Sequence, residues 1–242
     1  MSLTRVHRYC GPESLSDEVA KRLIEQLAGL QRNERVAQLC LTGGRTAQAM
    51  YERFAVRAAG AIDPARLELW WSDERFLPTD DPDRVAGPVL AVLAGSLTLK
   101  PARIHPMPGA DGLVESAQAA LTYAKELGDT AFDLCILGMG PDGHIASLFP
   151  GHPSGEPTTA LAIGVTDAPK PPLERITLTL QAINRAKQVW LLVTGADKAQ
   201  ACARALAGEV GLPAARVQGR EATHWFVDAE AAAGLPQHIC SL

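Results

Sequence analysis

Two kinds of hydrophobic pattern alternate along this chain. Short, mostly apolar runs are typical of buried strands, and they occur at 36–41, 67–71, 134–137, 161–166, 175–180, 188–193 and 223–227. Apolar residues that recur every three or four positions are typical of helices, and they occur at 14–32, 47–59, 112–127 and 196–207, with a further helix entered near residue 85 and a last helical turn at 229–233. The alternation predicts an α/β fold, a three-layer, mostly parallel, Rossmann-like sheet with helices on both faces. No repeat or linker divides the chain, so we expect residues 1–242 to form a single domain.

Polar or glycine-rich segments directly follow three of the predicted strands. They are Thr42–Thr46, Ser72–Arg75 and Gly138–His144, and Lys198 lies one turn into the helix that follows another strand. The carboxyl ends of parallel strands meet at one edge of a sheet, and open α/β sheets bind their ligands there. The sequence therefore predicts one site to which all four segments contribute.

The segment Gly138–Gly143 spells G-x-G-x-x-G, the pattern of dinucleotide-binding turns. Two features count against that interpretation. Asp142 would place a carboxylate where the pyrophosphate should meet a helix N-terminus. Pro150 and the prolines that follow leave room for a short helical run only. We therefore expect this turn to present Asp142 and His144 rather than to hold a dinucleotide.

Composition and charge exclude several classes of function. The 242 residues carry a net charge of −4, which gives no electrostatic footprint for nucleic acid or an anionic membrane. No apolar run approaches membrane-spanning length, and no apolar segment of a signal peptide follows the basic N-terminus. The five cysteines are scattered without C-x-x-C spacing, which favours a reducing compartment. We expect a cytoplasmic protein that binds neither nucleic acid nor membrane.

The segment Thr42–Thr46 lies between a strand and a helix, an arrangement that points backbone N–H groups at an anion. An ordinary tight turn with Thr46 as helix N-cap is the alternative. Asp142, His144 and His152 could together form a metal site, but no pattern such as H-E-x-x-H accompanies them. We expect neither a metal nor another cofactor.

From about residue 5 to residue 233 the chain resembles the 6-phosphogluconolactonases, within the NagB/RpiA-like glucosamine-6-phosphate isomerase/deaminase superfamily. The most specific block is Leu137–Pro150, and supporting blocks are Trp71–Arg75, Arg175–Thr177 with Asn184, Gly195 with Lys198, and Trp225–Asp228. The deaminases share the Asp-Gly-His core but continue differently, with a catalytic glutamate further on. The chain departs from the family pattern at Arg45, where the glycine loop usually has Ser, and at Asp83–Arg84, where Ser-Asn is usual.

The resemblance implies hydrolysis of 6-phospho-D-glucono-1,5-lactone to 6-phosphogluconate in the oxidative pentose phosphate pathway. His144 would be the general base that activates water, since an imidazole has a pKa of about 6.5, and a helix N-terminus at this position would favour the neutral ring. Asp142 would orient that ring or stabilise its protonated form. Asp73 and Arg75 would lie beside the sugar, with Arg75 as a donor to the developing oxyanion. We expect Glu74 to form a structural ion pair.

The resemblance also implies a phosphate anchor that combines backbone N–H groups with cationic side chains. Its residues would be Gly43, Gly44, Arg45, Thr46, Arg175 and Lys198. The partner would then be a small sugar-phosphate lactone, bound by a monomer or a small homo-oligomer. The alternatives are a glucosamine-6-phosphate deaminase or sugar-phosphate isomerase, and a non-catalytic sugar-phosphate sensor.

Overall fold

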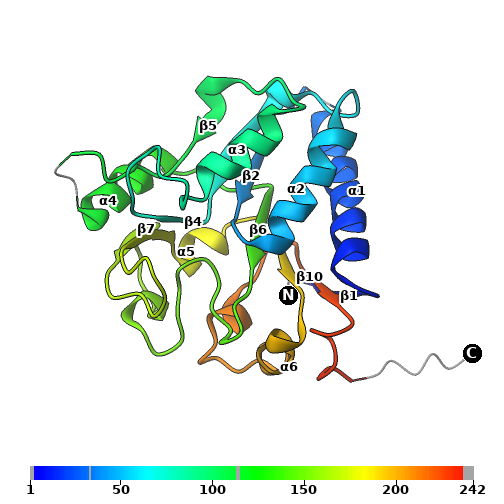
Figure 1. The fold of residues 1–242 in the computed structure, drawn as a ribbon, viewed down its shortest axis with the longest axis vertical. Helices are drawn as coiled ribbons and strands as arrows, with labels where there is room; N and C mark the ends of the chain where they lie inside the picture. Colours follow the sequence, from blue (N-terminus) through cyan, green and yellow to red (C-terminus); the bar gives the residue numbers. More distant parts are fainter. Residues whose placement is uncertain (1–2, 33, 113–114, 237–242) are drawn as a thin grey trace, which may run out of the picture.

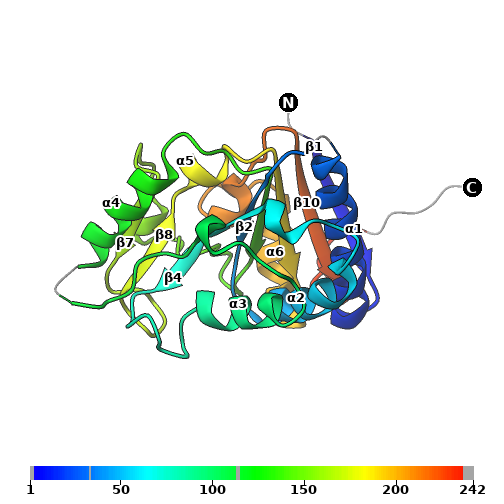
Figure 2. The same cartoon turned by 90° about the horizontal axis from the view of Figure 1, so that it is seen from above.

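The computed structural model describes residues 3–32, 34–112 and 115–236, and a seven-stranded sheet forms its centre (Figures 1 and 2). In spatial order its strands are β1 (Leu3–Tyr9), β10 (Ala222–Asp228), β9 (Gln188–Val193), β6 (Leu134–Gly138), β2 (Ala37–Leu41), β3 (Leu67–Trp71) and β5 (Ile104–His105). Every neighbouring pair in this sheet is parallel. The carboxyl ends of all seven strands therefore lie at one edge, which confirms the predicted parallel α/β fold.

Helices cover both faces of this sheet. One face is packed by α1 (Pro12–Gln31), α2 (Arg45–Ala58) and α3 (Ala86–Ala94), which group together in Figure 1, and the other by α4 (Ser116–Leu127), α5 (Leu180–Ile183) and α6 (Ala199–Leu206). Successive strand residues point to opposite faces of the sheet. In β2, Leu39 and Leu41 therefore belong to the hydrophobic cluster on the α1–α3 face, and Cys40 belongs to the cluster on the α4–α6 face. Both faces of the central strands are thus buried, which explains their uninterrupted apolar sequences.

A second, three-stranded antiparallel sheet lies beside the first. It contains β4 (Asp73–Arg75), β8 (Arg175–Leu178) and β7 (Ala162–Val165), in that order. The predicted strands at 161–166 and 175–180 thus exist, but they belong to this small sheet. Because β4 follows β3 directly and pairs Arg75 with Arg175, the small sheet brings a distant segment to the carboxyl edge of the main sheet.

Two short strands and the end of the chain need separate comparison with the prediction. Strand β1 was missed because most of its side chains are exposed, and β5 because it has two residues. At 229–233, where a last helical turn is predicted, the chain forms hydrogen-bonded turns with one i→i+4 bond, from the Ala232 N–H to the Asp228 carbonyl, and no regular helix. Residues 113–114 of the predicted helix 112–127 and Cys240 lie outside the described residues. Within the described part of the chain, no helix is long and apolar enough to cross a membrane.

Candidate active site

A cavity of about 310 Å³ opens at the carboxyl edge of the main sheet, among the turns that follow β2, β3, β6 and β9. Eight of the ten predicted site residues line it: Gly43, Gly44, Arg45, Asp73, Arg75, His144, Arg175 and Lys198. The other two, Asp142 and Thr46, each contact a residue of this edge from outside the cavity. The structure therefore brings together segments that are up to 155 residues apart in the sequence, as from Gly43 to Lys198.

His144 forms a hydrogen-bonded pair with Asp142. Its Nδ1 lies 2.5 Å from Asp142 Oδ1, and its side chain is 20 % exposed. With the Nδ1 proton donated to the carboxylate, the neutral ring keeps the Nε2 lone pair free to accept a proton. Burial lowers the pKa of His144 below its ordinary value, although the charge and hydrogen bond of Asp142 act in the opposite direction. The ring is therefore held in the neutral form that a general base requires.

The turn that carries this pair has no room for a side chain at Gly140. A Cβ atom there would lie 2.0 Å from Cε1 and 2.1 Å from Nδ1 of His144, and 2.7 Å from Asp142 Oδ1. The backbone closes on itself through Gly140 N–H to His144 O (2.9 Å) and Gly143 N–H to Gly140 O (3.0 Å). Glycine is thus required here so that the imidazole can fold back over the turn.

The helical run expected after His144 does not form. Residues 144–152 are turns and one isolated bridge, between Ile145 and Leu148. The expectation that a helix macrodipole keeps His144 neutral is therefore wrong. Burial is the main cause of the lowered pKa of His144 instead. The missing helix also removes the N-terminus that a dinucleotide turn would need.

Asp73 is 8 % exposed and accepts two hydroxyl hydrogen bonds. Ser147 Oγ donates to Oδ2 over 2.8 Å, and Ser72 Oγ donates to Oδ1 over 3.2 Å. Ser147 is fully buried, and its own N–H donates to Thr177 Oγ1 of the small sheet. The sequence indicated Ser147 only as part of the Leu137–Pro150 block, whereas the structure gives it a contact with a cavity carboxylate.

Of the charged residues at and near β4, Glu74 and Arg84 are buried and make structural contacts, whereas Arg75 lines the cavity. Glu74 is fully buried, accepts the N–H groups of Val85 and Ala86 at the start of α3, and lies 3.5 Å from Arg84 Nε. This confirms the structural ion pair expected for Glu74, whose pKa burial raises despite these donors. Arg84 donates to the carbonyls of Leu77 and Met107 and does not line the cavity. Arg75 lines the cavity, and its Nη1 donates to the Asp83 carbonyl over 2.5 Å.

The glycine loop after β2 leads into α2 through Gly44, which has a φ of +103° and is the helix N-cap. Thr46 is therefore not the N-cap, and in the described part of the chain no side-chain cap hydrogen bond is made to this helix. The first N–H groups of an uncapped helix lack partners within the helix and favour an anion. The geometry of the loop therefore suits a phosphate.

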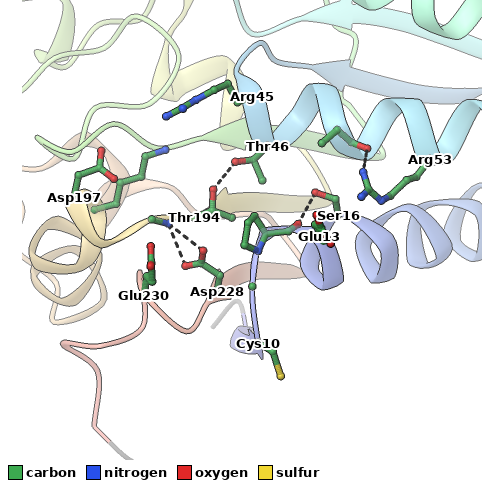
Figure 3. A pocket seen from close by; sticks show the side chains of 15 residues that line it. Cys10, Glu13, Ser16, Arg45, Thr46, Arg53, Thr194, Asp197, Asp228 and Glu230 are labelled. Atoms are coloured by element: carbon green, nitrogen blue, oxygen red, sulfur yellow. Dashed lines mark hydrogen bonds between the residues drawn. The ribbon is translucent and has the colours of Figure 1, made fainter.

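Thr46 faces a second, adjoining cavity of about 510 Å³ (Figure 3). Its hydroxyl lies 2.7 Å from the Thr194 hydroxyl. Arg45, Asp197 and Lys198 line both cavities. A contact between a ligand of the smaller cavity and the Thr46 side chain is thus not favoured, whereas Arg45 and Lys198 can serve that cavity.

The two remaining cationic residues have different surroundings. Lys198 is half-buried, and burial lowers its pKa while Asp197 opposes that effect. Arg175 is 8 % exposed and donates to the carbonyls of Lys170, Pro171 and Pro172. It therefore fixes the 170–172 loop while lining the cavity, and Lys170 Nζ in turn lies 4.0 Å from Asp142.

His152 is hydrogen bonded away from His144. Its Nδ1 accepts the Ser154 N–H (3.1 Å), its Nε2 lies 3.2 Å from the Thr166 carbonyl, and the Phe149 ring packs against both histidines. Within residues 3–32, 34–112 and 115–236, no three His, Cys, Asp or Glu side chains are grouped as metal ligands.

Comparison with known proteins identifies relatives over nearly the whole chain. The model of the family described as "Glucosamine-6-phosphate isomerases/6-phosphogluconolactonase" matches residues 11–225. A 6-phosphogluconolactonase of Streptomyces coelicolor is 44% identical, with 97% of this chain and 95% of that protein covered. A 6-phosphogluconolactonase of Mycobacterium tuberculosis is 40% identical over 89% of this chain and 92% of its own.

The fold is shared with solved structures as well. The crystal structure of 6-phosphogluconolactonase from Thermotoga maritima superposes with a TM-score of 0.83 at 28% identity, over 93% of this chain and 99% of that one. The residues that line the cavity lie between residues 42 and 198, so all of them fall within the part of the chain that the family model matches.

Proposed function

The chain belongs to the glucosamine-6-phosphate isomerase/6-phosphogluconolactonase family, and from that premise we propose that it hydrolyses 6-phospho-D-glucono-1,5-lactone to 6-phosphogluconate. It is then a carboxylic ester hydrolase of the pentose phosphate pathway. The observation that carries this proposal is one cavity that combines a half-buried, neutral histidine, oriented by a carboxylate, with several cationic side chains.

His144 is the general base of this reaction. Its Nε2 takes a proton from a water molecule, whose oxygen attacks the lactone carbonyl carbon, C1. Asp142 holds the ring through Nδ1 and stabilises the imidazolium that forms. General-base catalysis of this kind contributes about 10²–10⁴ in rate.

The attack creates a tetrahedral oxyanion, which then collapses. Arg75 donates to the oxyanion, and electrostatic stabilisation of this type contributes about 3–4 kcal/mol per donor. Collapse breaks the bond between C1 and the ring oxygen, and the His144 imidazolium returns its proton to that oxygen. Asp73, held by Ser147, accepts a hydrogen bond from a hydroxyl of the sugar.

The phosphate of the substrate lies between the start of α2 and the side chains of Arg45 and Lys198. The N–H groups of Gly43, Gly44, Arg45 and Thr46 and the side chains of Arg45 and Lys198 bind it, with Arg175 as a further cation of the cavity wall. Support for this assignment comes from the missing side-chain cap of α2 and from the two cations that line the cavity beside it.

We also propose that the chain acts as one domain, in the cytoplasm, as a monomer or a small homo-oligomer. All the groups named above come from one chain, and both of its sheets contribute to the same cavity. Cys10, Cys40, Cys135 and Cys202 are free thiols, which suits a reducing compartment.

The test uses lactone generated immediately before the assay. Acid release by the wild-type protein is followed at constant pH and compared with spontaneous hydrolysis. We expect a rate well above that background and no ammonia from glucosamine 6-phosphate. Ammonia release, or lactone hydrolysis at the background rate, would overturn the proposal.

A further inference from the structure

Lys198 is presented by a sharp turn between β9 and α6. Gly195 follows Thr194 and has a φ of +100°, and a short 3₁₀ helix, Ala196–Lys198, then leads into α6. Lys198 reaches the active-site cavity from this turn, three residues after Gly195. The position of its ammonium group therefore depends on how firmly the backbone of the turn is held.

Asp228, the last residue of β10, holds that backbone (Figure 3). Strand β10 pairs with β9 in parallel, with Val227 beside Val193, so Asp228 lies next to the turn. Its carboxylate oxygens accept the Gly195 N–H over 3.2 and 3.1 Å, and Oδ1 also accepts the Ala231 N–H over 2.8 Å. The residue is 2 % exposed, so the loss of these charge-assisted bonds would leave buried polar groups unpaired.

Glu230 also holds the backbone of this turn, because its Oε2 accepts the Ala196 N–H over 3.2 Å. Two successive N–H groups at the start of this helical segment are thus occupied by carboxylates. Within the described residues, no carboxylate accepts the corresponding N–H groups at the start of α2, whose N-cap Gly44 has no side chain. The two turns therefore differ in role. The turn before α2 can donate its N–H groups to an anion, whereas the Gly195 turn fixes the backbone that carries Lys198.

We propose that Asp228 is a positioning residue, which acts through the Gly195–Lys198 turn to hold the Lys198 ammonium group at the phosphate end of the active site. This inference rests on the proposed function, in which Lys198 binds the substrate phosphate. A misplacement of about 1 Å in a binding group can cost up to about 10²-fold, so release of the turn should weaken phosphate binding measurably.

The test compares Asp228→Asn in two backgrounds, wild type and Lys198→Ala. Asparagine keeps the shape of the side chain but replaces one acceptor oxygen by a donor that faces the Gly195 N–H. We expect the Kd for 6-phosphogluconate, measured by calorimetry, and the KM for the phosphorylated lactone to rise about tenfold, with kcat within about twofold. In the Lys198→Ala background the same substitution should change neither Kd nor KM further.

Two controls separate positioning from stability. Asp133 is also a buried carboxylate that accepts a backbone N–H, from Gln38, but it lies at the opposite edge of the sheet. Asp133→Asn should lower the melting temperature and leave Kd and KM unchanged. Unphosphorylated glucono-1,5-lactone should be hydrolysed by Asp228→Asn at the wild-type kcat/KM.

Several results would overturn the inference that Asp228 positions Lys198. Equal weakening in both backgrounds, or an equal loss with both lactones, would make Asp228 a structural residue only. If Asp228→Asn does not fold, Glu230→Gln decides, with an expected rise in Kd of about twofold to threefold that vanishes in the Lys198→Ala background. A wild type that binds 6-phosphogluconate without hydrolysing the lactone would refute the proposed function, and the Kd values would still decide this inference. A wild type that does not bind the sugar phosphate would refute this inference.

Discussion

Gly140→Ala is a single-methyl change that should disable His144 without altering its chemistry. The backbone at Gly140 does not have a positive φ, so alanine can adopt it. The new Cβ would lie 2.0 Å from His144 Cε1, whereas real Cβ contacts are essentially never shorter than 3.0 Å. The imidazole must therefore move by about 1 Å, and this displacement also breaks its hydrogen bond with Asp142.

The magnitude follows from that displacement. Misplacement of a catalytic group by about 1 Å costs about 10²-fold, and full loss of the general base costs up to about 10⁴-fold. We therefore expect kcat for lactone hydrolysis to fall by between about 10² and 10⁴. The added methyl group should cost about 1–3 kcal/mol of unfolding free energy. Acid release at constant pH gives kcat, and calorimetry gives the melting temperature.

Gly29→Ala is the matched control, because a Cβ at Gly29, inside α1, would have no neighbour within 4 Å. It should leave kcat unchanged and raise the unfolding free energy by about 0.5–1 kcal/mol. A folded Gly140→Ala protein with kcat within about threefold of the wild type would refute the assignment of His144 as the base held by this turn.

Three other predictions concern charge. Burial lowers the pKa of His144 below 6.5, and Asp142 partly opposes that effect, so kcat/KM of the wild type should rise with pH around a midpoint below 6.5. Asp142→Asn should shift that midpoint to lower pH and reduce the plateau of kcat/KM. A shift of the midpoint to higher pH would contradict this prediction. Burial, with Arg22, lowers the pKa of His224 to about 4, so the unfolded chain binds the proton first, and stability should fall by up to about 3 kcal/mol between pH 6.5 and pH 4. Denaturant unfolding of His224→Gln should show a smaller fall over the same range, and an equal fall would contradict the assignment. Arg45→Ser should raise KM for the phosphorylated lactone about threefold to tenfold with kcat retained, and an unchanged KM would show that Arg45 points to solvent.

The central sheet could be predicted because its strands are buried on both faces. Each of β2, β3, β6 and β9 is a short apolar run, and the polar or glycine-rich segment that follows it marks the carboxyl edge. The edge strand β1 could not be predicted in this way, because most of its side chains are exposed. The sequence also could not show that β8 pairs with β4, because periodicity indicates a strand but not its partner.

The residues that line the candidate site could be predicted from the sequence, but the residues that hold them in place could not. His144, Asp73, Arg75 and Lys198 follow strand ends, where chemistry is expected in this type of fold. The expected helix after His144 did not form, because the turn closes through Gly140 hydrogen bonds instead. Supports such as the hydroxyl of Ser147 depend on contacts between segments far apart in the chain, which no local pattern records.

The most direct test of this account is the kcat of His144→Ala with freshly generated lactone, measured beside binding of 6-phosphogluconate. If His144 is the general base, kcat falls about 10²- to 10⁴-fold while the Kd for 6-phosphogluconate stays within about threefold of the wild type. A variant that hydrolyses the lactone as fast as the wild type would contradict the assignment of His144 as the catalytic base.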